Sequence, residues 1–319
     1  MITKVSDIDS FNFSEAWSIP QAPTGYKSGF IGIVGRPNVG KSTLMNQLVG
    51  QKIAITSPVA QTTRNRLQGI LTTPEAQLIF VDTPGIHKPH HQLGEVLVRN
   101  ARIAIDSVDV ILFVVDGSQA AGGGDRFIVD LLSRTKNPVI LGINKIDQQA
   151  DSQQLDLTYE ELATPHQWQI VKFSALTKEG LNTLQQLLVT HLEPGPYYYP
   201  PDLVTDQPER FIMGELIREQ ILLLTREEVP HSVAVTIDRV EEDTTITRVL
   251  ATIHVERDSQ KGILIGKGGT MLKAIGSAAR EQMQKLIAGK VYLELFVKVQ
   301  PKWRQSRFRL SELGYRVEE

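Results

Sequence analysis

A stretch of nine residues, 35–43, has the residue types and spacing of a loop that binds phosphate. Four residues separate its two glycines, Gly35 and Gly40, and Lys41 and Ser42 follow the second. Such glycines let backbone N–H groups turn inward at the start of a helix, where unpaired donors and the helix dipole favour an anion. The pattern predicts that Lys41 reaches the outer phosphates of a nucleotide and that the Ser42 hydroxyl binds Mg²⁺. The nucleotide-binding residues predicted here are Gly35, Pro37, Asn38, Val39, Gly40, Lys41, Ser42 and Thr43.

A carboxylate suited to the same metal ion follows a second apolar run. Residues 78–81 are predicted to form a buried strand, and Asp82 comes directly after it, with Gly85 three residues further on. An aspartate in this position can hold Mg²⁺, usually through water, while the Gly85 N–H is free for the outermost phosphate. An aspartate that only caps a turn is the alternative, but the pairing with Ser42 favours the metal site.

The residues Asn144, Lys145, Ile146 and Asp147 follow a third apolar run and are predicted to bind a guanine base. Guanine offers its N1–H and its exocyclic amine side by side, so one carboxylate can accept from both, whereas adenine has no such pair. Asp147 would therefore select guanine. Asn144 would brace the loop and touch the base, and Lys145 would cover the face of the base. The backbone N–H for the guanine oxygen is predicted to come from the residues after the last strand, Ser174, Ala175 and Leu176.

These motifs require strands whose ends meet at one edge of a sheet. Apolar runs that alternate with helical segments predict an α/β fold with a mostly parallel sheet covered by helices on both faces. Ligands gather at the carboxyl ends of such strands. Residues 51–66 are predicted to form a mobile polar loop and residues 122–124 a Gly-rich loop. The predicted strands are 29–34, 67–72, 77–82, 110–115, 138–143 and 169–173, and the predicted helices include 41–49, 92–105 and 178–192.

Length and charge indicate a second domain with a different kind of ligand. A chain of 319 residues can bury more than one core. Residues 261–310 carry eleven Lys or Arg and two Glu, a local charge of +9, although the whole chain has a net charge of −2. One domain is therefore suited to a polyanion. The absence of cysteine excludes disulfides, thiolate metal sites and a cysteine nucleophile, and no apolar run is long enough to span a bilayer.

Prolines mark the boundary between the two domains. Four of them between residues 193 and 201 predict a short, semi-rigid linker. We divide the chain into an N-terminal extension (1–28), a nucleotide-binding domain (29–193), a Pro-rich linker (194–207) and a second domain (208–319). The extension fits neither a secretory signal nor an Arg-rich transit peptide, and we expect it to be loosely ordered. The second domain has the pattern helix, strand, strand, helix, helix, strand, which predicts a three-stranded sheet with helices on one face.

A glycine-rich turn in the basic region is predicted to bind nucleic acid. Gly266 and Gly269 would let a nucleic-acid backbone approach closely, and Lys267 and Lys273 would contact its phosphates. This turn and its apolar flanks resemble a KH domain of type II. A plain turn between two helices is the alternative, which the local charge argues against. After the last strand, Trp303 could stack on a base or pack against the sheet. The predicted RNA-binding residues are Ile265, Gly266, Lys267, Gly268, Gly269 and Lys273.

The nucleotide motifs resemble the translation-factor-like GTPases over residues 29–193. With the KH pattern added, the chain resembles the Era GTPases from about residue 28 to 315, and this α/β GTPase domain would be followed by an α+β KH domain. The family pattern implies that one of two threonines, Thr62 or Thr63, closes on Mg²⁺ and the outermost phosphate. We favour Thr63. The catalytic residues implied by the resemblance are Lys41, Thr63 and Gly85.

The resemblance also implies a role. It implies a monomeric GTPase that uses GTP or GDP and Mg²⁺, binds 16S rRNA near its 3′ end and assists assembly of the 30S ribosomal subunit. It further implies a cytoplasmic protein with peripheral association at the inner face of the cell membrane. Two alternatives stay open: an RNA-binding assembly factor in which hydrolysis is secondary, and a peripheral membrane GTPase of cell-cycle control whose basic face meets anionic lipid.

One residue departs from the pattern of many signalling GTPases. Ile86 stands where those proteins carry a glutamine that orients the attacking water, so we expect slow intrinsic hydrolysis. Asn38 is similar to an asparagine that helps to hold K⁺ in some such families, and we expect K⁺ to raise the rate. Arg64 or Arg66 could supply the same positive charge instead.

Overall fold

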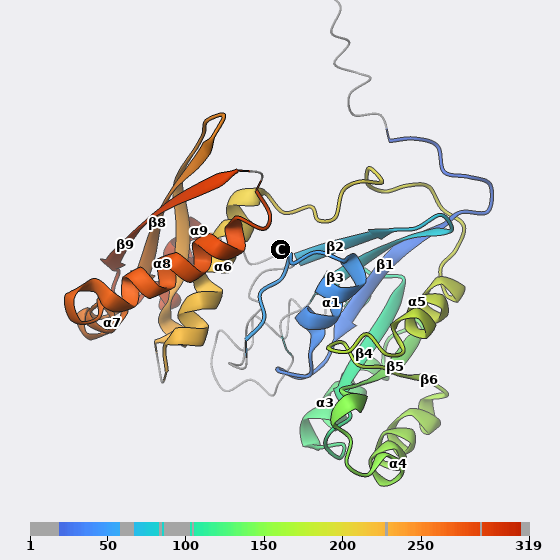
Figure 1. The fold of residues 1–319 in the computed structure, drawn as a ribbon. Helices are drawn as coiled ribbons and strands as arrows, with labels where there is room; N and C mark the ends of the chain where they lie inside the picture. The colour runs from blue at the N-terminus through green and yellow to red at the C-terminus, as the bar shows by residue number, and fades with distance from the viewer. Residues whose placement is uncertain are drawn as a thin grey trace, which may run out of the picture.

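Two sheets with different strand orders organise the chain, and an extended segment crosses from one to the other (Figure 1). The computed structural model describes residues 19–57, 67–82, 85, 103, 105–226, 229–287 and 289–313.

The larger sheet has the strand order β2-β3-β1-β4-β5-β6. Its neighbouring strands run parallel except for β2 and β3, which form an antiparallel hairpin. The six strands predicted from the sequence are confirmed to within two residues at either end. They are β1 (Lys27–Val34), β2 (Leu67–Thr72), β3 (Ala76–Asp82), β4 (Val110–Asp116), β5 (Val139–Asn144) and β6 (Gln169–Lys172).

Helices cover both faces of this sheet, and each face has its own hydrophobic core. Helices α1 (Lys41–Val49) and α5 (Leu181–Thr190) share one core with the sheet. Helices α3 (Gly123–Leu132) and α4 (Ser152–Ala163) share the other. The predicted α/β fold is therefore confirmed. The predicted helix 92–105 lies largely outside the described residues.

The glycine-rich loop predicted at residues 122–124 is wrong in part, because Gly123 and Gly124 begin α3. The cause is Asp125, whose carboxylate accepts the Gly122 N–H at 2.9 Å and caps the helix, which therefore begins two residues earlier than the glycines suggest. A side chain at Gly124 would meet the Arg36 side chain, since a Cβ there would lie 2.6 Å from Arg36 Cδ.

The mobile loop predicted at residues 51–66 is wrong at its start. Ile53, Ala54 and Ile55 are each less than 5% exposed. The Asn46 side chain holds this stretch: its oxygen accepts the N–H groups of Ile53 (3.0 Å) and Ala54 (2.9 Å), and its nitrogen donates to the Ala54 carbonyl (2.7 Å). Residues 58–66 lie outside the described residues.

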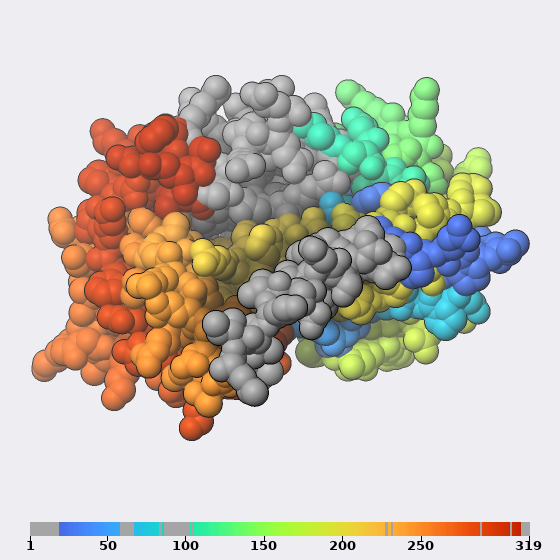
Figure 2. Space-filling model, turned by 90° about the horizontal axis from the view of Figure 1, so that it is seen from above, coloured from blue at the N-terminus to red at the C-terminus, as the bar shows by residue number. Residues whose placement is uncertain are grey.

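The Pro-rich linker is fixed against the β2–β3 hairpin. The buried Gln77 side chain accepts the N–H groups of Tyr198 (2.8 Å) and Tyr199 (3.0 Å) and donates to the Tyr199 carbonyl (2.9 Å). Further along, the Ile70 N–H donates to the Val204 carbonyl at 2.9 Å. In Figure 2 the yellow linker residues lie beside the blue residues that precede β1.

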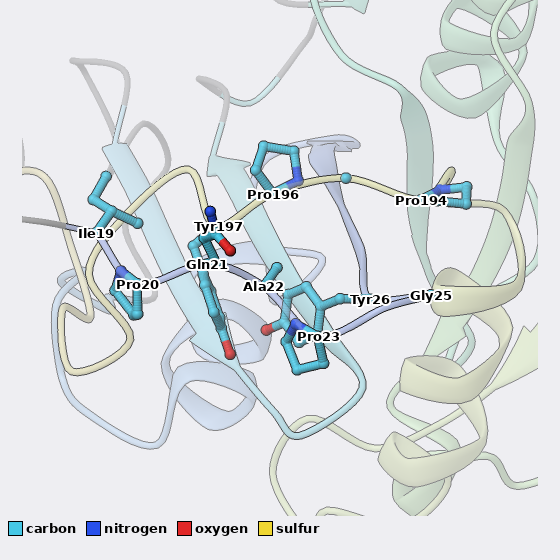
Figure 3. A pocket seen from close by; sticks show the side chains of 11 residues that line it. Ile19, Pro20, Gln21, Ala22, Pro23, Gly25, Tyr26, Pro194, Pro196 and Tyr197 are labelled. Atoms are coloured by element: carbon cyan, nitrogen blue, oxygen red, sulfur yellow. The ribbon is translucent and has the colours of Figure 1, made fainter.

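A surface pocket of about 580 Å³ lies where the linker meets the residues before β1 (Figure 3). The rings of Tyr26 and Tyr197 contact each other there, with centroids 4.6 Å apart. The Tyr26 hydroxyl donates to the Thr73 carbonyl at 3.1 Å, which ties the pocket to the β2–β3 turn. Its lining residues belong to 19–26 and 194–197, so none comes from the predicted phosphate or guanine loops.

The smaller sheet has the order β7-β8-β9, with β8 antiparallel to β7 and parallel to β9. Three helices pack on one face of it around a single core. The predicted order of helices and strands is confirmed. The elements are α6 (Glu209–Leu224), β7 (Ala234–Glu242), β8 (Ile246–Val255), α7 (Asp258–Ile265), α8 (Thr270–Met283) and β9 (Lys290–Val299), followed by the short helix α9 (Arg307–Glu312).

Trp303 packs against the domain and cannot stack on a base. Its side chain is buried beside Ala234 and Leu313, and its indole N–H donates to the Ser232 carbonyl at 3.1 Å. Of the two predictions for this residue, packing is confirmed.

Two glycines with nearly the same backbone conformation allow a test of local packing. Gly50 has φ 79° and Gly180 has φ 73°, but a Cβ at Gly50 meets nothing within 4 Å, whereas one at Gly180 lies 2.3 Å from the Lys172 carbonyl oxygen. Gly50→Ala should cost about 1 kcal/mol for the left-handed conformation alone. Gly180→Ala should cost about 2 kcal/mol more, because the strand and helix must move apart. Urea unfolding of both variants checks this, and equal midpoints would contradict it.

Candidate functional site

The phosphate loop lies between β1 and α1, and its glycines are required by their neighbours. A Cβ at Gly35 would lie 2.3 Å from the Val114 carbonyl oxygen of β4, so no larger residue fits there. Gly40 caps α1 with φ 99°, and a Cβ there would lie 2.3 Å from the Asn144 side chain. The loop and the helix N-terminus therefore have the arrangement that the predicted anion site requires.

Lys41 folds back across this loop. Its ammonium donates to the carbonyls of Gly35 (3.0 Å) and Arg36 (2.9 Å), and the residue is 7% exposed. Burial lowers the pKa of Lys41 to about 8, while the nearby Asp82 carboxylate acts in the opposite direction. A negatively charged phosphate group in the predicted anion site would favour the charged ammonium in the same way.

Ser42 and Asp82 meet as predicted, although forty residues separate them. The Ser42 hydroxyl donates to the Asp82 carboxylate at 3.0 Å, and Asp82 is fully buried at the end of β3. A hydroxyl and a carboxylate are the hard oxygen ligands that Mg²⁺ prefers. The pair therefore fits a magnesium ion at the edge of the phosphate loop.

Asn144 joins three loops. It is 2% exposed at the end of β5. Its side-chain nitrogen donates to the Val39 carbonyl of the phosphate loop at 2.7 Å, and its oxygen accepts the Ala175 N–H at 2.9 Å. The predicted bracing role of Asn144 thus has a geometric basis.

The Lys145 side chain is oriented by Asp116, a residue that was not predicted to belong to the site. Its ammonium donates to the Asp116 carboxylate at 2.6 Å, and Asp116 also accepts the Ser118 hydroxyl at 2.6 Å. Burial alone would raise the pKa of Asp116, but the hydrogen bonds from Lys145 and Ser118 outweigh it, so the pKa lies below its usual value. The only signal in the sequence is the position of Asp116 at the carboxyl end of the apolar β4.

The remaining residues predicted to bind guanine follow β5 and β6 on the same edge of the sheet. Asp147 is exposed in a short 3-10 helix after β5. Ser174 is buried and its hydroxyl accepts the Thr177 N–H at 3.0 Å, which shapes the loop after β6. Leu176 is 68% exposed. A base between Asp147 and this loop could receive the contacts that the sequence predicts.

Two further predicted residues lie at the phosphate loop: Gly85 borders it, and Asn38 is part of it. Gly85 lies against Pro37, since a Cβ at Gly85 would be 2.9 Å from the Pro37 backbone nitrogen. Asn38 is exposed with φ 64°, a conformation that asparagine tolerates better than most residues. Thr62, Thr63 and Ile86 lie outside the described residues.

A second unpredicted carboxylate supports the phosphate loop from outside. The Arg36 guanidinium donates to the fully buried Asp125 carboxylate at 2.7 Å. Asp125 also accepts the Gly122 N–H, so one side chain starts α3 and holds Arg36. Because 89 residues separate the two charges, no local pattern could reveal the pair.

The second candidate site is the turn between α7 and α8. Lys267, Gly268 and Lys273 are exposed there, and Leu264 and Ile275 on either side are fully buried in the core. Gly268 and Gly269 have φ 61° and 80°, and a Cβ on either meets nothing within 4 Å. The turn therefore presents bare backbone and lysines to solvent, as close approach of a nucleic-acid backbone requires.

Two other classes of site find no support in the described part of the chain. Within it, no group of three His, Asp or Glu residues is placed to hold a metal ion. None of its helices is both long and apolar enough to cross a membrane.

Two family models match the chain. The family described as 50S ribosome-binding GTPase matches residues 30–145, and the KH domain family matches residues 228–304. The chain is 80% identical to GTPase Era of Nostoc sp. over 319 residues, which cover 99% of this chain and 98% of that protein. It is 73% identical to GTPase Era of Rippkaea orientalis, over 94% of this chain and 96% of that protein.

Two solved structures of Era proteins match this chain across both of its domains. One is Era in complex with MgGDPNP and nucleotides 1506–1542 of 16S ribosomal RNA, with a TM-score of 0.87 and 39% identity over 91% of this chain and 99% of that chain. Another is a variant of Era from Aquifex aeolicus bound to GDP and AlF4⁻, with a TM-score of 0.86, the same identity and the same coverage.

The bracing role of Asn144 can be separated from a general effect on stability. Asn144→Ala leaves the Val39 carbonyl and the Ala175 N–H without this partner, so it should lower the free energy of unfolding by about 2–4 kcal/mol and weaken GDP binding about tenfold or more. Asn137→Ala is the matched control, because that amide also joins two backbone groups, in its case two carbonyls at 2.8 and 3.1 Å, away from the site. It should lower stability but leave GDP affinity unchanged, as measured by titration calorimetry. Equal losses of affinity in the two variants would refute the assignment.

Proposed function

The chain belongs to the Era family of GTPases, and from that we propose that it is a GTP-dependent switch that binds 16S rRNA near its 3′ end and assists assembly of the 30S subunit. One observation carries the proposal. One chain combines residues suited to bind phosphate and guanine with a basic KH domain that exposes a glycine turn. Era bound to MgGDPNP and 16S rRNA nucleotides supports the same combination.

The GTPase reaction transfers a phosphoryl group to water, so the protein acts mainly by positioning groups and stabilising charge. We assign the N–H groups of the phosphate loop and Lys41 to the β- and γ-phosphates, and Asp147 to the base. Ser42 and Asp82 would hold Mg²⁺, which when bound neutralises charge that develops on the phosphate oxygens. Gly85 would donate its N–H to the γ-phosphate, and Thr63 rather than Thr62 would complete the site.

The charge distribution supports RNA as the ligand of the second domain. The segment 261–310 with its charge of +9 contains the exposed turn and both lysines assigned to phosphate contacts. We place the RNA-binding domain at 208–319, the GTPase domain at 29–193, and between them the linker 194–207. We further propose a monomer that acts in the cytoplasm, with peripheral contact to the inner face of the membrane made by the same basic surface.

The glycine turn gives the direct test of RNA binding. Replacing both Gly268 and Gly269 by Asp introduces two side chains without a steric clash, because a Cβ at either position meets nothing within 4 Å. The two carboxylates repel the RNA phosphates, so the affinity for an RNA with the sequence of the 16S 3′ end should fall about tenfold or more. Asn at both positions is the matched control, since it has the same shape, tolerates positive φ and carries no charge. It should bind RNA more tightly than the Asp variant. Unchanged RNA affinity in the Asp variant, with binding to anionic liposomes reduced instead, would favour the membrane alternative.

Asn38 gives the test of monovalent cation dependence. We expect GTP turnover about tenfold or more faster in KCl than in NaCl at equal ionic strength, because a cation beside the phosphates can replace an arginine finger, whose contribution is about 10³–10⁵. Asn38→Gly keeps the positive φ and removes the side-chain oxygen, so the two salts should become equal. A wild type with equal rates in both salts would dispose of the K⁺ site, and Arg64 and Arg66 would then be the residues to substitute.

A further inference from the structure

A carboxylate of the KH domain reaches into the GTPase domain. Glu219 lies in α6, and its side chain is 2% exposed. One of its oxygens accepts the Thr56 N–H at 2.8 Å and the Thr56 hydroxyl at 3.3 Å. The other accepts the Lys52 ammonium at 2.5 Å. One buried side chain thus holds both the backbone and a charge of residues 52–56.

Lys52 connects this carboxylate to the helix that carries the RNA-binding turn. Its ammonium also lies 3.5 Å from the Gln282 side-chain oxygen of α8. Helix α8 begins at Thr270, directly after the glycine turn, and Gln282 lies about 18 Å further along it at 1.5 Å per residue. A rigid helix therefore runs from the RNA site to the Lys52 contact.

Helix α6 belongs to both domains. Phe211 in its first turn packs against the core of the GTPase domain, and Met213, Leu216 and Ile217 belong to the core of the KH domain. Because the residues around Glu219 belong to the core of the KH domain, a change in the tilt of that domain moves Glu219 relative to the GTPase domain.

The contacted segment is joined in sequence to the residues proposed to sense GTP. Residues 52–56 precede 58–66, which contain Thr62 and Thr63, and β2 follows at Leu67. On that other side, the linker pairs with β2, since Thr205 bridges Gly69 and its hydroxyl donates to the Gln68 carbonyl at 2.7 Å. The second half of the chain therefore contacts the described residues on both sides of 58–66, at Lys52 and Thr56 before it and at Gln68 and Gly69 after it.

We propose that Glu219 is a positioning residue between the two domains: it fixes residues 52–56 through Thr56 and Lys52 and so couples RNA binding to the nucleotide state. This inference rests on the proposed switch function and names the contact through which the switch acts. Linkage requires the coupling to be reciprocal, so the nucleotide that favours the Glu219 contact also changes the affinity for RNA.

The test compares RNA affinity in two nucleotide states. Kd for the 3′-terminal 16S RNA is measured with the full chain loaded with GDPNP and with GDP, and the ratio of the two values is the coupling factor. Coupling factors of about 5–150 are typical of such linkage. Glu219→Gln keeps an acceptor for the Thr56 N–H but removes the charge that holds Lys52, so its factor should fall about fivefold or more, toward one.

Glu215→Gln is the matched control. Glu215 lies one turn earlier on α6 and pairs with Arg218 of the same helix at 2.7 Å. Glu215→Gln removes the charge that pairs with Arg218, so it should lower the free energy of unfolding. Since the substitution removes no contact to residues 52–56, the coupling factor should stay within about twofold of the wild-type value. A purely structural role for Glu219 would give this same result for Glu219→Gln and would overturn the proposal.

Lys52→Met provides a second variant on the other side of the contact, at a side chain that is 33% exposed. It should lower the coupling factor in the same direction as Glu219→Gln, and an unchanged factor would overturn the proposal even if Glu219→Gln does not fold. A wild-type factor of one would overturn the proposed switch itself. A wild-type factor that differs from one and persists in both variants would overturn only the role of Glu219.

Discussion

The side-chain amide of Asn144 is the constraint on which the nucleotide site depends. Its two hydrogen bonds fix the distance between the phosphate loop and the loop after β6, which the chain itself leaves free because 105 and 31 residues separate the partners. A parallel sheet brings the strand ends to one edge, but it does not lock the loops that follow them. One buried amide, with a donor and an acceptor on the same planar group, can hold a carbonyl on one side and an N–H on the other.

Much of this arrangement could be predicted from the sequence because the chemistry and the scaffold have local signatures. The strands are continuous apolar runs, and the motif residues follow them directly. What the sequence could not reveal are contacts between charges far apart in the chain, such as Asp116 with Lys145 or Asp125 with Arg36. The two errors at residues 53–55 and 123–124 have the same origin. In each case a nearby polar side chain, Asn46 or Asp125, supplies hydrogen bonds that order a segment with no periodic pattern.

The linker is the part of the chain in which sequence and structure complement each other most. Its prolines limit the backbone, which predicts stiffness but not direction. The direction comes from Gln77, a buried amide on β3 that binds the linker backbone with three hydrogen bonds. Stiffness and attachment together deliver the chain to the start of α6 at a fixed place beside β2. The KH domain therefore begins from an anchored point rather than from a free tether.

The chemistry of the contact at Glu219 suits a connection that must be remade. A buried ion pair adds little net stability compared with apolar side chains of the same size, but it has only one good geometry. Lys52, Thr56 and Glu219 therefore specify one arrangement of the two domains without fixing them together as a continuous apolar core would. Breaking the contact exposes a carboxylate, an ammonium and a hydroxyl, all of which water solvates well. Such an interface can separate at moderate cost and return to the same register, which is what a coupling between a nucleotide site and an RNA site requires.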